Sequence, residues 1–242
     1  MSLSIIIPCK NEEENIGDTV NQILNCLSNK IDEFEIIIIN DFSSDNTFEI
    51  LKALAQANTK IKFYNNQIIG LGGAVTLGIQ KSLYKFSIIV MADLSDSPED
   101  ILKYYIEIKN NDLDAVFGTR FSPHSKVLGY PKKKLFFNRT FNFLVKILFW
   151  HRYNDFTNAF KIYKTAVLIK LFPIISENFN IFLELPLKII SRKYKFSIIP
   201  INWENRKAGE AKFKIKELSS MYFFTLIYCF IEKTLLNKKK FD

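Results

Sequence analysis

The chain has 242 residues, 48% of them hydrophobic, which excludes global disorder and suits one large domain or two small ones. Its 33 Lys and Arg outnumber 25 Asp and Glu, and the formal net charge of +8 favours anionic partners such as a nucleotide diphosphate or an anionic membrane surface. Nucleic acid is the least favoured partner, because the charge is spread along the chain and the sequence shows no recognised nucleic-acid motif. Three widely separated cysteines without disulfide or zinc spacing indicate a reducing compartment.

Strands and helices alternate five times in the first half of the chain. Apolar runs predict buried strands at residues 3–7, 34–39, 61–64, 86–90 and 114–117. Helices are predicted between them, the first opened by Asn11 as its cap. Because the strands are continuous Ile- and Val-rich runs, the pattern predicts an α/β fold with a mostly parallel central sheet flanked by helices on both faces.

After Arg120 this alternation stops, and aromatic residues become frequent. Residues 132–150 predict a helix with a narrow polar stripe that includes Arg139, Asn142 and Lys146. A basic, aromatic helix of this kind can lie in a membrane interface or pack on the sheet, and the sequence leaves both open. Further strands are predicted at residues 155–163 and 196–201, with a helix around 182–192.

The final segment, residues 213–236, predicts one long apolar helix. We therefore divide the chain into a domain of residues 1–212 and a C-terminal helix with a basic tail, residues 213–242. This second part is expected to dock on a membrane or on a membrane-protein partner. Its uncharged stretch is followed by Glu232 and Lys233 and is too short to span a bilayer.

A carboxylate-rich turn follows the fourth predicted strand. Asp93 and Asp96 come just after this strand, and Ser97-Pro98-Glu99 predicts the start of the next helix, with Ser97 as its cap. Ligands bind at the carboxyl ends of the strands in open α/β sheets, so these carboxylates lie where a ligand is expected. Hard oxygen ligands suit Mg²⁺ or Mn²⁺ holding a diphosphate. A solvated turn whose acids only cap a helix is an equal alternative from this stretch alone.

Three other segments have a functional and a plainer interpretation. Asp41 ends the second strand at the same sheet edge and could bind a base or ribose, whereas Ser43 or Ser44 could simply cap the next helix. The glycines of residues 70–73 lack the spacing of a dinucleotide fingerprint, so we expect a helix entry where backbone approaches a phosphate or sugar. The basic segment 206–212 suits a flap over phosphates, although such a run is commonly a solvated loop.

Taken in their order along the chain, the segments given at the end of this paragraph resemble the motifs of family 2 glycosyltransferases, which have the GT-A fold. Within the family, the resemblance is greatest to the dolichyl- or polyprenyl-phosphate sugar synthases. Asn40 and Met91 depart from the pattern, because the family usually has aspartate at both positions, and Ser95 stands where these synthases often have glutamine. The matching segments are Ile5 to Glu12 (with P-x-x-N-E), Ile39 to Thr47 (with D-D-G-S-x-D-x-T), Gly70 to Val75 (with G-x-G-x-A), Met91 to Glu99 (D-x-D-x-Q-x-x-P-E), Gly118 to Phe121 (G-S-R-[FY]), Asn138 to Asn142 (the acceptor-side helix), Asp155 to Phe160 (D-x-T-N-G-F) and Arg206 to Lys212 (R-x-x-G-x-S-K).

The resemblance implies inverting transfer of a sugar from a nucleotide diphosphate-sugar to a polyprenyl phosphate, by a protein held peripherally on the cytoplasmic face of the membrane. A Mg²⁺ or Mn²⁺ ion on Asp93, Ser95 and Asp96 would neutralise the leaving diphosphate. The implied acceptor-phosphate residues are Arg120, Arg139 and Asn142, and the implied catalytic residues are Asp93, Arg120 and Arg139. The implied nucleotide-sugar site comprises Pro8, Asn11, Glu12, Asp41, Ser43, Gly72, Asp93, Arg206 and Lys212.

Two other functions stay open at this point. The acceptor could be a sugar hydroxyl of a polysaccharide or lipopolysaccharide, which would require a general base, and Asp155 and Glu184 are the candidates for it. Alternatively, the chain could be an inactive nucleotide-sugar-binding subunit, an idea motivated by Asn40 and Met91.

Overall fold

A seven-stranded sheet runs through the middle of the protein, in a computed structural model that describes residues 2–93, 95–205 and 215–238. Side chains are described throughout these ranges except at residues 215–219, 237 and 238. The strands of the sheet are β1 (Ser2–Cys9), β2 (Glu33–Asn40), β3 (Ile61–Asn65), β4 (Phe86–Ile89), β5 (Ala115–Thr119), β7 (Lys161–Lys164) and β8 (Phe196–Pro200). Two short strands, β6 (Val127–Leu128) and β9 (Trp203–Glu204), form a separate parallel pair.

The strand order is β3-β2-β1-β4-β7-β5-β8, and the sheet is mostly parallel, as predicted. The exception is β7, which lies antiparallel between β4 and β5. The strand predicted at residues 155–163 is therefore only partly correct, because pairing begins at Lys161. Residues 155–160 form a loop instead, since the Asp155 side chain accepts from Arg120, just after β5, and Asn158 Nδ2 donates to the carbonyl oxygen of Gly118 near the end of β5.

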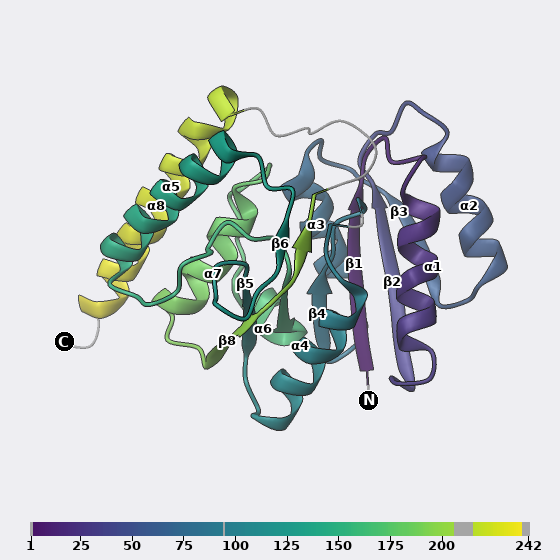
Figure 1. Ribbon diagram of the computed structural model, residues 1–242, viewed down its shortest axis with the longest axis horizontal. Coiled ribbons are helices and arrows are strands. Elements are labelled where there is room, and N and C mark those ends of the chain that lie inside the picture. The colour runs from purple at the N-terminus through teal and green to yellow at the C-terminus, as the bar shows by residue number, and fades with distance from the viewer. Residues whose placement is uncertain (1, 94, 206–214, 239–242) are drawn as a thin grey trace.

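Helices cover both faces of this sheet (Figure 1). The alternation of side chains along β1 sends Leu3, Ile5 and Ile7 into one core and Ile6 into the other, which is why the strand is apolar at every position. The first core is closed by α1 (Ile16–Leu27), α2 (Thr47–Ala57) and α4 (Pro98–Asn110), and the second by α3 (Leu71–Lys81), α6 (Thr165–Lys170) and α7 (Ile181–Ser191).

Two long helices, α5 (Lys132–Phe149) and α8 (Ile215–Lys238), lie side by side at one end of the molecule (Figure 1). The rings of Phe141 and Tyr222 meet at 5.6 Å between centroids, and Lys233 Nζ donates to the Phe149 carbonyl oxygen at 2.7 Å. Helix α8 also packs on α7, where Asn180 Nδ2 donates to Thr225 Oγ1 at 2.9 Å. The helices predicted at residues 132–150 and 182–192 are confirmed, whereas the predicted start of the last helix lies outside the described residues.

Within the described ranges, the structure contains no helix that is both long enough and apolar enough to cross a membrane.

The predicted helix caps are partly wrong. Helix α1 begins only at Ile16, and Asn11 lies in the preceding loop with φ +48°, where its Oδ1 accepts the Ser44 amide at 2.7 Å. Neither Ser43 nor Ser44 caps α2, because Asn46 occupies that position. At α4, by contrast, Ser97 is the residue at the cap position and Pro98 opens the helix.

Candidate functional site

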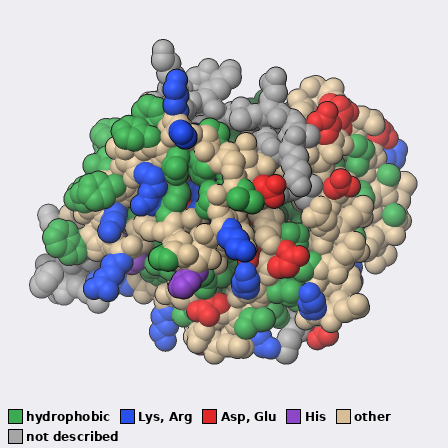
Figure 2. Space-filling model, in the orientation of Figure 1, with side chains coloured by type: hydrophobic (Ala, Val, Ile, Leu, Met, Phe, Trp, Pro, Cys, Tyr) green, Lys and Arg blue, Asp and Glu red, His purple; other side chains and the backbone are tan. Residues whose placement is uncertain are grey.

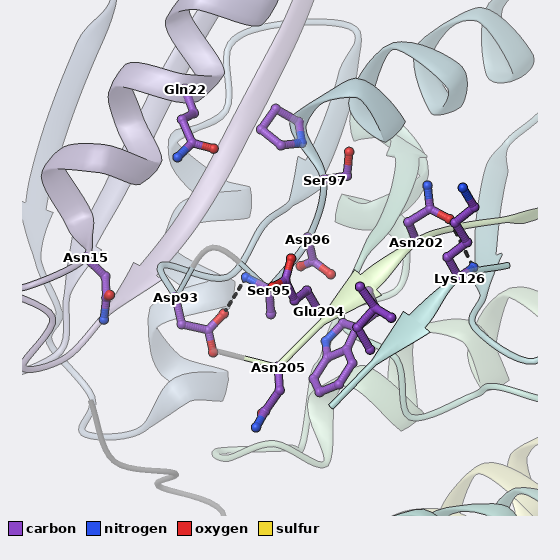
Figure 3. Close-up of a pocket in the computed structure, with 13 residues that line it drawn as sticks. Asn15, Gln22, Asp93, Ser95, Asp96, Ser97, Lys126, Asn202, Glu204 and Asn205 are labelled. Atoms are coloured by element: carbon purple, nitrogen blue, oxygen red, sulfur yellow. Dashed lines mark hydrogen bonds between the residues drawn. The ribbon is translucent and has the colours of Figure 1, made fainter. Parts of the chain in front are cut away.

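The acidic turn between β4 and α4 lies at the centre of the candidate site. The side chains of Asp93, Ser95 and Asp96 are only 6%, 7% and 7% exposed. The backbone amide of Ser95 donates to Asp93 Oδ1 at 3.2 Å, which fixes the first carboxylate over the turn (Figure 3). Two cavities, of about 330 Å³ and about 310 Å³, meet at these three residues.

Most residues that line the cavity of about 330 Å³ are polar, and we call it the polar cavity. Asn15 and Gln22 reach it from the start and the middle of α1, on the side of the turn opposite β6 and β9 (Figure 3). The other described lining residues are Asp93, Ser95, Asp96, Ser97, Pro98, Lys126, Leu128, Asn202, Trp203, Glu204 and Asn205.

The second cavity, which we call the aromatic cavity, lies on the side of the turn that faces α5 and α8. Two cations, Arg120 and Lys134, are part of its wall, and seven of its fifteen other described lining residues are aromatic. The described lining residues are Met91, Asp93, Ser95, Asp96, Arg120, Tyr130, Lys134, Phe137, Asn138, Phe141, Thr157, Asn158, Ala159, Phe179, Phe182, Trp203 and Tyr222. The cavity therefore combines an acidic turn, two cations and an apolar body.

The acidic turn fits a divalent cation. Asp96 Oδ2 is buried and has no hydrogen-bond partner, and its burial, together with the nearby charge of Asp93, raises the pKa of Asp96 to about 7. A cation between these two carboxylates would satisfy the orphaned oxygen and relieve their repulsion. Among the described residues there is no cluster of three His, Cys, Asp or Glu side chains, so the remaining ligands would be water and phosphate oxygens, as Mg²⁺ prefers.

Arg120 is held in the wall of the aromatic cavity by a buried ion pair with Asp155. Its Nε donates to Asp155 Oδ2 at 2.9 Å, its Nη2 donates to Oδ1 at 2.7 Å, and its backbone amide donates to Oδ2 at 2.9 Å. Burial of the guanidinium opposes its charge, but the carboxylate more than compensates and the pKa of Arg120 is raised. The sequence predicted that the Arg120 guanidinium binds an acceptor phosphate. Two of its nitrogen atoms, Nε and Nη2, already donate to Asp155.

The two carboxylates considered as general bases are both structural. Asp155 is fully buried, and both of its oxygens accept hydrogen bonds from Arg120. Glu184 is also fully buried, accepts the backbone amides of Ile175 and Ser176, and pairs with Lys188 at 2.6 Å. Neither belongs to the described wall of the cavities, so the geometry does not favour either as a general base.

The polar stripe of α5 reaches the site through different residues than expected. Arg139 is exposed, stacks 4.3 Å over the Phe121 ring and is outside the described lining of both cavities, whereas Lys134 lies in the wall of the aromatic cavity. Asn142 is 1% exposed and donates to Thr157 Oγ1 at 3.1 Å, so it supports the wall behind Asn138 rather than forming it. Extending the Asn142–Asn138 spacing by one turn would have found Lys134 in the sequence.

Five of the residues predicted for the nucleotide lie at or just after the carboxyl ends of β1 and β2, the same sheet edge as the acidic turn, but outside the described lining of the cavities: Pro8, Asn11, Glu12, Asp41 and Ser43. Asp41 Oδ1 accepts the amide of Gly70 at 2.9 Å, and Lys10 Nζ lies 3.8 Å from Oδ2. Asn11, Glu12 and Ser43 hold the loops together, because the Asn11 amide donates to Ser43 Oγ at 3.0 Å and the Glu12 amide donates to Thr47 Oγ1 at 2.9 Å. Pro8 is buried near the end of β1.

Gly72 has a different role from the one predicted. Its amide donates to the Glu177 carbonyl oxygen at 2.8 Å, and a Cβ at this position would overlap the Ser176 carbonyl oxygen. The close backbone approach that requires glycine is therefore made by another segment of the same chain, and the Gly72 amide is already used in that contact. Arg206 and Lys212 of the predicted flap lie outside the described residues.

With this geometry established, comparison with protein families identifies the class. Residues 4–172, well over half of the chain, match the family described as Glycosyl transferase family 2. The chain belongs to this family.

Three curated relatives resemble it over most of its length. Glycosyltransferase AglD of Haloferax volcanii is 24% identical over 88% of this chain and 34% of that protein. Polyprenol monophosphomannose synthase of Mycolicibacterium smegmatis is 25% identical, with 86% and 79% covered. Dolichol-phosphate mannosyltransferase of Pyrococcus furiosus is 28% identical, with 90% and 61% covered. The chain thus spans less than two thirds of the length of the first and third relatives.

Solved structures confirm the GT-A architecture. Glucosyl-3-phosphoglycerate synthase from Mycobacterium tuberculosis, crystallised with Mn²⁺, uridine diphosphate and phosphoglyceric acid, superimposes with a TM-score of 0.71. The match covers 95% of this chain and 78% of that one at 14% identity, so it shows a shared fold.

We predict that Mn²⁺ binds more tightly as the pH rises through about 7, because Asp96 must lose its proton to ligate a cation. Without metal, Asp96 keeps its proton in the folded state up to a pH of about 7, whereas in the unfolded state it loses the proton near its ordinary pKa of 3.8. The free energy of unfolding therefore falls as the pH rises through that interval. The Asp96→Asn variant should remove both effects and weaken Mn²⁺ binding on the order of tenfold or more. Electron paramagnetic resonance titrations at both ends of the interval, with thermal melts of the metal-free protein, measure them.

The control is Asp112→Asn, which changes an exposed carboxylate at the amino end of β5. Wild-type Mn²⁺ affinity that is the same below and above neutral pH, or an Asp96→Asn protein that binds as well as the control, would contradict the metal assignment.

Proposed function

We propose that this glycosyltransferase moves a hexose from a nucleotide diphosphate-sugar to a polyprenyl phosphate. The observation that carries the proposal is the aromatic cavity, whose cationic residues and acidic turn adjoin a wall of aromatic side chains from α5, α7 and α8. This wall suits an amphiphile with a phosphate head and an apolar chain. Two relatives, whose names describe polyprenol and dolichol phosphate mannose chemistry, support the same acceptor class.

Asp155 and Glu184 are both occupied by hydrogen bonds and ion pairs within the protein, which supports a phosphate acceptor over a hydroxyl acceptor. A phosphate monoester loses its second proton near pH ~6, so it is already a nucleophile at neutral pH and requires no general base. What it requires is positioning and charge balance, and we assign these tasks to Lys134 and to the remaining donors of Arg120. Asn138, held by Asn142 and Thr157, would orient the phosphate from the other side.

On the donor side, we propose that the diphosphate lies against the acidic turn and that the nucleoside extends along the sheet edge toward Asp41. Asp93, Ser95 and Asp96 would hold Mg²⁺ or Mn²⁺, which supplies charge neutralisation of the leaving diphosphate. Arg206 and Lys212 remain proposed contacts to the same diphosphate. An acceptor phosphate in the aromatic cavity would attack the anomeric carbon from the side opposite the leaving diphosphate, which would invert the configuration at that carbon.

We further propose that α5 and α8 rest on the cytoplasmic face of a membrane, with residues 1–212 as the catalytic domain and 213–242 as the docking segment. Figure 2 shows hydrophobic side chains gathered at the end of the molecule formed by these helices, with Lys and Arg among them. Phe136, Phe143, Phe224 and Trp150 are 67%, 62%, 65% and 90% exposed, unusual values for such side chains. A lipid acceptor would enter the aromatic cavity from this surface.

The first test compares two cations on α5. Lys134→Ala should raise the KM for polyprenyl phosphate roughly tenfold to a hundredfold, because a charge-assisted hydrogen bond contributes about 1.5–3 kcal/mol. Arg139→Ala is the matched control, since it removes an exposed cation outside the described cavity walls. Steady-state kinetics with both variants measure the difference. A larger effect of Arg139→Ala on the acceptor KM would show that the acceptor phosphate lies elsewhere.

The second test concerns the membrane. Replacing the exposed Lys132, Lys133 and Lys146 with Gln should weaken binding to anionic vesicles by about 1 kcal/mol per residue at low salt, with the melting temperature nearly unchanged. Vesicle co-sedimentation measures binding, and Trp150 fluorescence in a Trp203→Phe background reports insertion of the exposed indole. Equal binding by wild type and the triple variant would contradict a contribution of these lysines to membrane binding. Trp150 emission that does not shift when vesicles are added would show that this end of α5 does not contact the lipid surface.

A further inference from the structure

The polar and aromatic cavities share four described lining residues. Three belong to the acidic turn, Asp93, Ser95 and Asp96, and the fourth is Trp203 at the start of β9. Trp203 is thus the aromatic side chain at the place where the two cavities meet.

The backbone of β9 is attached to the acidic turn on both sides of Trp203. The Glu204 amide donates to the Ser95 carbonyl oxygen at 3.2 Å, and Asp96 forms an antiparallel bridge with Trp203. The Asn202 amide donates to Asp100 Oδ2 at 2.8 Å, one turn into α4. The indole is therefore fixed relative to the carboxylates by main-chain contacts.

The ring itself is supported without being buried. It packs on Tyr130 at 4.9 Å between centroids with planes inclined by 41°, and the Arg120 guanidinium lies 6.0 Å from its centroid. It is nevertheless partly exposed and does not belong to the buried hydrophobic clusters of the described residues. An ordered aromatic ring that is left open to two cavities has the properties of a ligand platform.

We propose that the Trp203 indole is the platform for the hexose in transfer, an inference that rests on the proposed function. With the diphosphate at the acidic turn and the acceptor phosphate in the aromatic cavity, the sugar must lie between them, beside Trp203. The C–H face of a pyranose matches an aromatic ring, and the π-face attracts the positive charge that develops at an anomeric carbon during glycosyl transfer. Trp203 would thus select a sugar-bearing donor and orient its anomeric carbon toward the acceptor.

The chain offers a direct spectroscopic test, because it contains only two tryptophans. Trp150 is 90% exposed at the end of α5 and lies outside the described cavity walls, so Trp150→Phe leaves Trp203 as the sole indole reporter. With Mg²⁺ present, this variant is titrated with UDP, UDP-glucose, GDP and GDP-mannose. We expect at least one sugar donor to change Trp203 emission more than its bare diphosphate does. The same titrations of Trp203→Phe, which reports from Trp150, should show no such difference.

Kinetics supply the second readout. Trp203→Leu should lower kcat roughly tenfold or more while leaving the Kd of the bare diphosphate unchanged, and Trp203→Phe, which keeps an aromatic ring, should retain most of the turnover. Circular dichroism and thermal melts confirm that both variants fold. The platform is overturned if every sugar donor and its diphosphate give equal emission changes, or if folded Trp203→Leu turns over like wild type. Failure of the proposed acceptor differs from this result, because wild type would then form no lipid-linked product although Trp203 still responds to the sugar donor.

Discussion

Buried negative charge at the carboxyl edge of the sheet is the constraint on which the site depends. Asp93 and Asp96 follow one strand within a single turn, both almost fully buried. Arg120 lowers the pKa of Asp96, but burial and the charge of Asp93 outweigh it. Arg120 is itself balanced by Asp155, so the turn retains negative charge that a bound cation can neutralise. A site of this kind favours a divalent metal together with an anionic leaving group.

The loops around the turn are held by buried polar contacts rather than by the core alone. Lys161, in the antiparallel strand β7, donates to the carbonyl oxygens of Phe156 and Asn158, and its burial lowers the pKa of this lysine to about 7. Those carbonyls belong to the loop that carries Asp155, so β7 positions the acid that in turn positions Arg120. The antiparallel strand β7 therefore helps to place Arg120 in the wall of the aromatic cavity.

Much of the fold could be predicted because its signals act over a few residues. The Ile-rich strands, the Ser97-Pro98 helix start and the position of Asp93 past β4 all follow from local pattern. The order of matching motifs also predicted the family correctly. What could not be predicted depends on neighbours distant in sequence. Gly72 resembled a phosphate loop, yet its close neighbour is the backbone near residue 177.

The site shows the same division between local and distant contacts. The pairing of Arg120 with Asp155 spans 35 positions, and it changed the interpretation of both residues. On α5 the helix was predicted, but which of Lys134 and Arg139 faces the cavity depends on how the helix packs. Trp203 carried no motif, and its importance follows from β9 pairing with the acidic turn. Sequence pattern therefore located the edge of the sheet, while tertiary contacts decided which side chains line the cavities.

The central claim is that the two cavities bring a nucleotide diphosphate-sugar and a polyprenyl phosphate together at the acidic turn. The most direct measurement is mass spectrometry of the lipid fraction after the purified protein is incubated with Mg²⁺, a panel of nucleotide sugars and polyprenyl phosphate, with the matching polyprenol as a parallel acceptor. The account predicts a polyprenyl phosphate heavier by one hexose with at least one donor, and no product from the polyprenol. Transfer to the polyprenol, or transfer to a glycan hydroxyl while polyprenyl phosphate stays unmodified, would contradict it.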